Sequence, residues 1–277
     1  MKNNNSSNVA AVFGELFSVI RTLRSENGCP WDLKQTPESF HPYILEEYHE
    51  MVQALNRGDE RGIVDEAGDL TFLVVLVAYM FEQQGFTTVE EIIRTVISKM
   101  VRRHPHVFGQ TQVKDDQEVV DNWNKIKATE KTVLERTSHL DGIPRTLPAL
   151  SRSQRMTKRA GTVGFDWSDP QDVFPKVYEE LEELKQAIES GSPEKIVEEF
   201  GDLLFVMVNA ARLFNVNAEA ALNKTTDKFE SRFRYIEAAL RERGKSPEDA
   251  DLAEMDELWD EAKALERESE RKAGKQD

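Results

Sequence analysis

The sequence has a single cysteine, Cys29, among 277 residues. A lone cysteine excludes a framework of intrachain disulfides and fits a reducing compartment. The longest mostly apolar run, Leu70 to Phe81, is shorter than the ~20 residues that a membrane-spanning helix needs. The polar stretch after Met1 has no apolar core following a basic start, so no signal peptide is predicted. We therefore expect a cytoplasmic protein with no membrane partner.

Basic residues are also in the minority. Lysine and arginine total 36 against 51 aspartates and glutamates, which gives a formal net charge of −15. Nucleic-acid binding usually relies on a broad basic surface, so we expect no nucleic-acid partner. Small polyanions stay compatible with this composition where local cations or metal ions meet their phosphates.

Strand patterns are missing as well. No stretch of useful length alternates apolar and polar residues with period two, whereas apolar residues recur at helical spacing through most of the chain. The sequence therefore predicts an all-α fold.

Two neighbouring segments of the second half place acidic pairs beside an apolar stripe. In the first segment, Glu180 and Glu183 fall roughly 70° and 130° from the centre of the stripe. In the second segment, Glu199 and Asp202 lie at nearly the same angles, roughly 80° and 140°. The break at Gly191-Ser192-Pro193 separates the two. Antiparallel packing of the two helices would therefore bring four carboxylates together.

Four ionised carboxylates in a small volume require a positive partner. Hard divalent cations, Mg²⁺ or Mn²⁺, suit oxygen ligands and keep positions open for water and phosphate oxygens. The alternative for a Glu-rich helix is simply a solvated face. Gly201 beside Asp202 costs roughly 1 kcal/mol of helix stability relative to alanine. We therefore interpret it as a point of close approach by another backbone or a ligand.

The charged motifs occur twice in the same order. Each half has a Glu-Glu-x-x-Glu motif, then Glu-x-x-Asp, then Lys-x-x-x-Arg, then Trp-x-x-x-Lys, behind a similar loop. Four motifs repeated in order predict two homologous helical domains in tandem. We expect a disordered tail over residues 1–8, a first domain over 9–136, a linker over 137–148, a second and catalytic domain over 149–265, and a frayed charged tail over 266–277.

The cationic motifs favour phosphate as the ligand. Lys228 and Arg232 lie one helical turn apart, as do Trp259 and Lys263. An ammonium and a guanidinium suit a polyphosphate, and an indole can cover a base or sugar. The alternatives are an ordinary surface pair for the two cations and core packing for the tryptophan.

Together, these phrases resemble the MazG family of nucleoside triphosphate pyrophosphohydrolases, from about residue 9 to residue 265. The matching phrases include N-G-C-P-W-D, R-R-H-P-H-V-F, G-F-D-W, E-E-F-G-D-L-L-F and D-E-L-W-D-E-A-K. The resemblance implies a homodimer of tandem all-α domains. It also implies Mg²⁺-dependent hydrolysis of nucleoside and deoxynucleoside triphosphates to monophosphate and pyrophosphate, with broad base specificity and a house-cleaning role in the nucleotide pool.

The resemblance also assigns residues. It implies metal ligation and catalysis by Glu180, Glu183, Glu199 and Asp202, and substrate contacts from Lys228, Arg232, Trp259 and Lys263. We add Asn209, because it lies on the same stripe seven residues beyond Asp202 and the first half has Leu76 there. The first half keeps every position of these charged motifs, which would form a possible second site: Glu47, Glu50, Glu66, Asp69, Lys99, Arg103, Trp123 and Lys127.

Two other functions stay open at this point. One is a non-catalytic module that binds nucleotide with Mg²⁺ and senses it without turnover. The other is a related enzyme specialised for one substrate, such as dUTP or phosphoribosyl-ATP. Nucleotide binding without turnover would favour the first, and a substrate panel would reveal the second.

Overall fold

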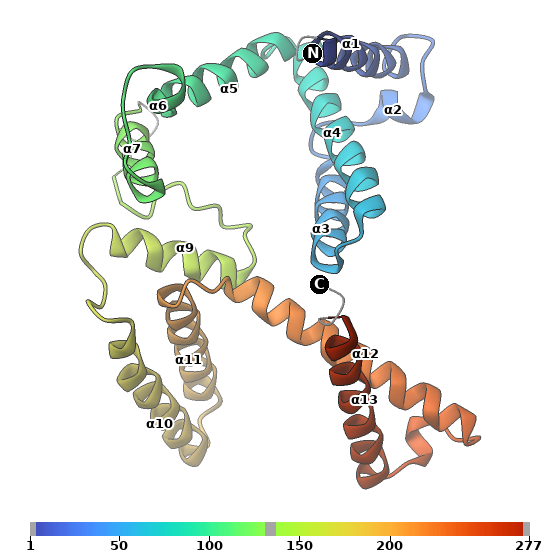
Figure 1. The fold of residues 1–277 in the computed structure, drawn as a ribbon, viewed down its shortest axis with the longest axis vertical. Helices are drawn as coiled ribbons and strands as arrows, with labels where there is room; N and C mark the ends of the chain where they lie inside the picture. Colours follow the sequence, from blue (N-terminus) through green and yellow to red (C-terminus); the bar gives the residue numbers. More distant parts are fainter. Residues whose placement is uncertain (1–3, 131–136, 274–277) are drawn as a thin grey trace. The chain divides into compact units, whose positions relative to one another are not determined.

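The computed structural model describes residues 4–130 and 137–273, and every regular element in these ranges is a helix. The chain divides into two compact units, residues 1–135 and 136–277. The all-α fold class and its tandem organisation are confirmed. Figure 1 shows the helices of each unit in sequence colours.

The first unit is organised around a helical hairpin. Helices α3 (His41–Arg57) and α4 (Glu60–Gln83) pack against each other, and α1 (Asn4–Leu23) packs on α4. Gly58 ends α3 in the left-handed conformation (φ 67°), which glycine adopts without strain. Ile20, Phe40 and Leu76 form the core with Leu73, Val75 and Met80. The remaining helices are α2 (Pro30–Lys34), α5 (Val89–Arg103), α6 (Pro105–Phe108) and α7 (Asp116–Ala128).

The second unit repeats the hairpin. After α9 (Ala149–Gly161) and the short 3₁₀ turn η1 (Pro170–Val173), α10 (Phe174–Ser190) packs against α11 (Pro193–Leu213). Gly191 (φ 67°) ends α10, and the Ser192 side chain caps α11 by accepting a bond from the backbone N–H of Lys195. The turn is therefore short enough to hold the two helices side by side.

A second hairpin completes this unit. The long helix α12 (Ala218–Glu242) packs against α13 (Leu252–Ala273) after the turn η2 (Pro247–Asp249). Leu240 and Leu258 are fully buried between them, with Ile236 beside them. Helix α9 packs on both α11 and α12 and so connects the two hairpins.

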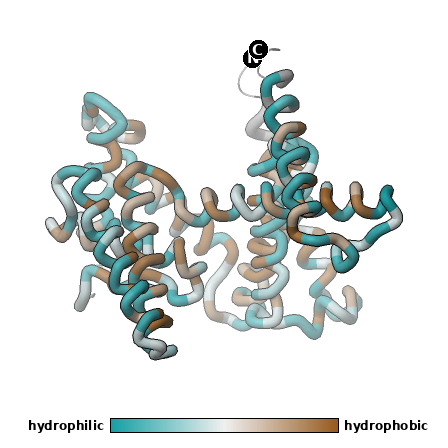
Figure 2. Tube along the Cα trace, turned by 90° about the horizontal axis from the view of Figure 1, so that it is seen from below, coloured by the Kyte–Doolittle hydropathy of each residue, from teal (hydrophilic) through white to brown (hydrophobic). Residues whose placement is uncertain are grey.

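Figure 2 shows hydrophobic and hydrophilic residues alternating along the helices. This pattern is expected for amphipathic helices that bury one face. Among the described helices, none is both long and apolar enough to cross a membrane.

Two expectations from the sequence are wrong, and a third is wrong in part. Helix α1 begins at Asn4, so residues 4–8 are helical and only residues 1–3 of the expected tail lie outside the described part. Helix α13 continues to Ala273, so most of the expected frayed tail is helical. A Cβ atom at Gly201 would meet nothing within 4 Å, so no backbone of the described residues approaches this glycine closely, and the approach of a ligand stays a prediction.

Candidate metal and substrate site

The hairpin of α10 and α11 brings three acidic side chains together. Glu180 from α10 and Glu199 and Asp202 from α11 each offer a carboxylate oxygen, and these oxygens all lie within 4.8 Å of one another. Glu180 is buried, Glu199 is half-buried and Asp202 is exposed. The cluster therefore lies at the edge of the hairpin, where its open side faces solvent.

Glu183, which we expected in the same set, is exposed and is not part of the three-residue group. Its charge is nevertheless close enough to act on Glu199. Burial raises the pKa of Glu199 most, and repulsion from Glu183, Asp202, Glu198 and Glu180 raises it further. The second unit thus concentrates negative charge that a cation would relieve.

One lysine already neutralises part of this charge. The Nζ of Lys176 lies 2.8 Å from a carboxylate oxygen of Glu180 and 2.8 Å from one of Glu179. These two carboxylates raise the pKa of Lys176, so the ammonium stays charged. The first unit has Tyr43 at the matching position, so no lysine of this kind pairs with the cluster from there in the described part of the chain.

We expect the Glu199→Gln variant to have a higher melting temperature than the natural chain at pH 8 without added metal. The raised pKa means that ionised Glu199 is less favourable in the folded than in the unfolded chain. This penalty is present above the raised pKa and fades as the pH falls through it. Differential scanning calorimetry of both proteins from pH 4 to 8 tests this. An increase in melting temperature of Glu199→Gln over the natural chain that grows toward pH 4 would contradict the prediction.

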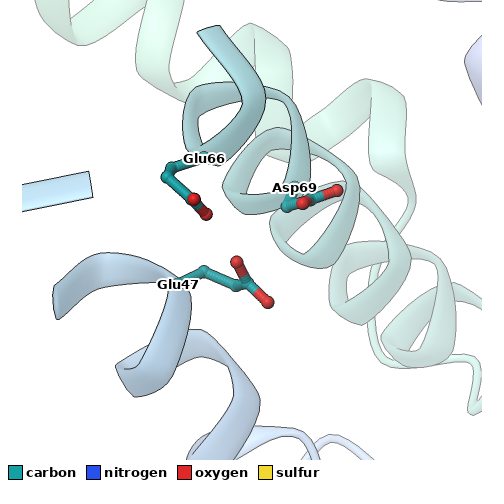
Figure 3. Close-up of side chains that lie close together, drawn as sticks. All are labelled: Glu47, Glu66 and Asp69. Carbon is teal, nitrogen blue, oxygen red and sulfur yellow. The ribbon is translucent and has the colours of Figure 1, made fainter. Parts of the chain in front are cut away.

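The first unit builds a matching cluster from Glu47 on α3 and Glu66 and Asp69 on α4. Figure 3 shows Glu66 on α4 and Glu47 on α3 facing each other, with Asp69 further along α4. Burial raises the pKa of Glu47 most, followed by a hydrogen bond with Glu66 and repulsion from the nearby acids. Glu50, like Glu183, is not part of the group.

Both clusters fit a hard divalent cation. Each offers three oxygen ligands from two helices, with one side left open, and oxygen donors of this kind suit Mg²⁺ or Mn²⁺. In neither cluster does a histidine or cysteine join the group, so softer metals have no preferred ligand there.

Of the expected cationic and aromatic residues of the second unit, Arg232 on α12 and Trp259 on α13 are in contact. The Arg232 guanidinium carbon lies 5.2 Å from the ring centroid of Trp259. Two of its nitrogens donate to one carboxylate oxygen of Glu266, at 3.0 and 2.8 Å. Lys228 is exposed on the same helix, and Lys263 pairs with Asp260 at 3.0 Å. In the described chain, no hydrogen bond or ion pair joins this group to the acidic cluster.

The first unit repeats this arrangement in a more closed form. Arg103 stacks on Trp123, with 4.9 Å to the ring centroid, and donates to both oxygens of Glu130. Arg102 donates to the same carboxylate, and the Arg103 and Glu130 side chains are only 10% and 12% exposed. In the second unit, Arg232 and Glu266 are 20% and 30% exposed. Lys99 is half-buried on α5, and Lys127 lies on α7.

Asn209 is buried on α11, and its Oδ1 accepts a hydrogen bond of 2.8 Å from Arg212. Arg212 also pairs with Asp166, in the loop after α9. Sequence reasoning missed Asp166, Lys176, Glu130 and Glu266. One signal was available, since each glutamate follows its tryptophan by seven residues in both halves.

Comparison with known proteins identifies the family. Residues 35–108 and 168–236 match the model of the MazG nucleotide pyrophosphohydrolase domain. The chain belongs to the MazG family. It is 41% identical over 252 residues to the nucleoside triphosphate pyrophosphohydrolase/pyrophosphatase MazG of Thermotoga maritima, covering 91% of this chain and 96% of the relative. It is 42% identical over 256 residues to the nucleoside triphosphate pyrophosphohydrolase of Escherichia coli K12, covering 91% and 97%.

The two MazG matches coincide with the structural repeat. The first includes α3 and α4 with Glu47, Glu66 and Asp69, and the second includes α10 and α11 with the other cluster. Both matches end before the tryptophan helices α7 and α13. An uncharacterized protein of Bacillus subtilis, YabN, is also similar, at 44% identity over 258 residues, which cover 93% of this chain and 53% of YabN.

Proposed function

We propose that this MazG-family chain hydrolyses nucleoside and deoxynucleoside triphosphates to nucleoside monophosphates and pyrophosphate. Family membership makes it a nucleoside triphosphate pyrophosphohydrolase, and its relatives in T. maritima and E. coli carry that name. The observation that carries the proposal is the cluster of Glu180, Glu199 and Asp202, whose oxygens converge within 4.8 Å. We further propose Mg²⁺ dependence, with Mn²⁺ as a substitute, and a broad range of bases.

Glu180, Glu199 and Asp202 would hold the metal, with Glu183 at the rim. A divalent cation there supplies electrophilic stabilisation of phosphate charge and lowers the pKa of water. One of the glutamates of the cluster would accept a proton from the attacking water. Lys228 and Arg232 would neutralise charge on the departing pyrophosphate. Trp259 and Lys263 would complete the substrate contacts.

The second unit is proposed as the principal catalyst. In the first unit, Arg103 is buried in a bond to Glu130 that Arg102 also shares, which leaves its guanidinium little freedom to reach a phosphate. Arg232 is more exposed, and it donates to one oxygen of Glu266, whereas Arg103 donates to both oxygens of Glu130. The first unit also has Leu76 and Tyr79 where the second has Asn209 and Arg212. Its cluster of Glu47, Glu66 and Asp69 would therefore have a weaker or structural role.

We propose a homodimer as the active form. The outer faces of α11 and α12 expose large apolar side chains, including Phe200, Leu204, Met207 and Phe229, each at least half exposed. Apolar exposure of this kind is typical of surfaces that bind another protein. A second copy covering these faces could also bring its Lys228 and Arg232 to the acidic cluster. Light scattering after size-exclusion chromatography measures the mass directly.

We also propose that the protein is cytoplasmic.

The test of function is product analysis by phosphorus NMR. The purified protein is incubated with mixed nucleoside and deoxynucleoside triphosphates, with Mg²⁺ or with a chelator. We expect nucleoside monophosphate and pyrophosphate with Mg²⁺ only, and the rates for each base give the substrate range. Nucleoside diphosphate and orthophosphate as products would mean that the γ-phosphate is released, which would contradict the proposed cleavage to monophosphate and pyrophosphate. Binding without turnover would instead identify a nucleotide-sensing module.

A further inference from the structure

The carboxamide of Asn209 is held in one orientation. Asn209 is 8% exposed, and its Oδ1 accepts from the Nε of Arg212 at 2.8 Å. Arginine nitrogens only donate hydrogen bonds, so the atom that faces Arg212 must be the oxygen. The Nδ2 group, with its two N–H donors, therefore points away from Arg212.

Arg212 is itself fixed by a bidentate pair. Its two terminal nitrogens donate to the two oxygens of Asp166, at 2.9 and 2.6 Å, and the side chains are 13% and 24% exposed. Arg212 lowers the pKa of Asp166, which keeps the carboxylate ionised. A Cβ atom at Gly161 would lie 2.6 Å from an oxygen of Asp166, so the glycine makes room for this carboxylate. The orientation of Arg212 is thus determined by the loop after α9.

The donor end of Asn209 is open. Among the described residues, no hydrogen bond of Nδ2 is found, and no fully buried polar side-chain atom lacks a partner. The Nδ2 group must therefore reach the accessible surface. Asn209 follows Asp202 by seven residues, which places it on the same side of α11, within roughly 20° and about 10.5 Å further along the axis.

We infer that Arg212 and Asp166 are positioning residues that present only the N–H donors of Asn209 to the nucleoside part of a bound triphosphate. This inference rests on the proposed function, in which the phosphates lie at the acidic cluster. A nucleotide whose phosphates lie at Asp202 and whose long axis follows α11 toward its C-terminal end would bring its nucleoside to Asn209. The contact selects a hydrogen-bond acceptor, such as a carbonyl oxygen or ring nitrogen of a base. The first unit has apolar Leu76 at this position and no such donor.

Three variants test whether Arg212 acts through Asn209: Asn209→Ala, Arg212→Met and the double variant. Loss of one hydrogen bond is expected to raise KM about three- to tenfold in each. The value of kcat should change less than twofold, since the reacting phosphates lie elsewhere. The double variant should show no more loss than Asn209→Ala alone. Losses that multiply, or an unchanged KM in Arg212→Met, would overturn the inference.

The Asn209→Asp variant tests the polarity of the contact. A carboxylate still accepts from Arg212, so the fold is kept, but an acceptor replaces the donor that faces the ligand. We expect KM to rise more than in Asn209→Ala, and an α,β-methylene triphosphate analogue to bind more weakly by calorimetry. Binding equal to that of the natural chain would refute the inference. The same comparison is made with ribose 5′-triphosphate, which has no base. If Asn209→Asp no longer raises KM with this substrate, the contact is to the base; if KM still rises, the contact is to the sugar.

Arg243→Met is the matched control, because Arg243 pairs with Glu254 in the α12–α13 hairpin and has no proposed contact with nucleotide. It should keep the natural KM. If the natural chain binds the analogue but does not hydrolyse triphosphates, the proposed function fails, and the binding series still tests Asn209. If hydrolysis is normal and the Asn209 and Arg212 variants match the natural chain, only the present inference fails.

Discussion

Replacing Glu180 by glutamine is expected to lower Mg²⁺-dependent hydrolysis of triphosphates by about 100-fold or more. Glu180 is the most buried member of the cluster; it pairs with Lys176 and has an oxygen within 4.8 Å of the two acids of α11. A neutral amide keeps the shape of the side chain but removes the charge that balances a divalent cation. The rate is measured as pyrophosphate release over a Mg²⁺ titration, because a weakened metal site shifts the titration to higher concentration.

Two matched variants show whether this loss is specific. Glu182→Gln changes a solvent-exposed glutamate on the same helix, which pairs with Lys185, and should keep full activity. Glu47→Gln makes the corresponding change in the cluster of the first unit and should cost much less than Glu180→Gln. Equal losses from Glu47→Gln and Glu180→Gln in a folded protein would contradict the assignment of the second unit as principal catalyst.

The Glu130→Gln variant is expected to destabilise the first unit by about 3 kcal/mol, the cost of breaking a mostly buried ion pair. Its carboxylate accepts from both Arg102 and Arg103, and these bonds lower the pKa of Glu130 to about 2. Glutamine would leave the Arg103 guanidinium, whose side chain is 10% exposed, without its negative partner. Urea unfolding followed by circular dichroism gives the change in stability.

The same pair has a defined pH dependence. The folded pKa of Glu130 is depressed below its ordinary value of 4.5, so its stabilisation is complete above about pH 4.5 and is lost as the pH falls toward 2. The natural chain and Glu130→Gln should therefore converge in stability over this range. The control is Glu90→Gln, which removes an exposed pair with Arg94 and should change stability by less than about 0.5 kcal/mol. A difference between the natural chain and Glu130→Gln that stays constant to pH 2 would contradict the role of this carboxylate.

The placement of the acidic residues was predictable because it depends on local geometry. Helical periodicity puts Glu199 and Asp202 on one edge of α11, and the turn at Gly191 brings Glu180 beside them. The exclusion of Glu183 from the group was not predictable. Angular position alone does not say how far the side chain of an exposed residue is from its neighbours across the hairpin.

Only the structure shows which side chains the cationic residues contact. The repeated Lys-x-x-x-Arg and Trp-x-x-x-Lys motifs predicted phosphate contacts, but the sequence did not reveal that Arg232 binds Glu266 while resting on Trp259. Glu266 was even assigned to a frayed tail. These contacts join residues 27 or more positions apart, where no helical period constrains the distance.

By itself, the sequence determined the all-α class, the tandem repeat, the position of the two acidic clusters and the family, since all of these follow from short-range spacing and repeated motifs. Tertiary structure decided which charges meet. It placed the Asp166 loop against Arg212 and so fixed the orientation of Asn209, and it enclosed Arg103 more tightly than Arg232. The physical reason is that burial and ion pairing depend on packing between helices, which spacing along one helix does not specify.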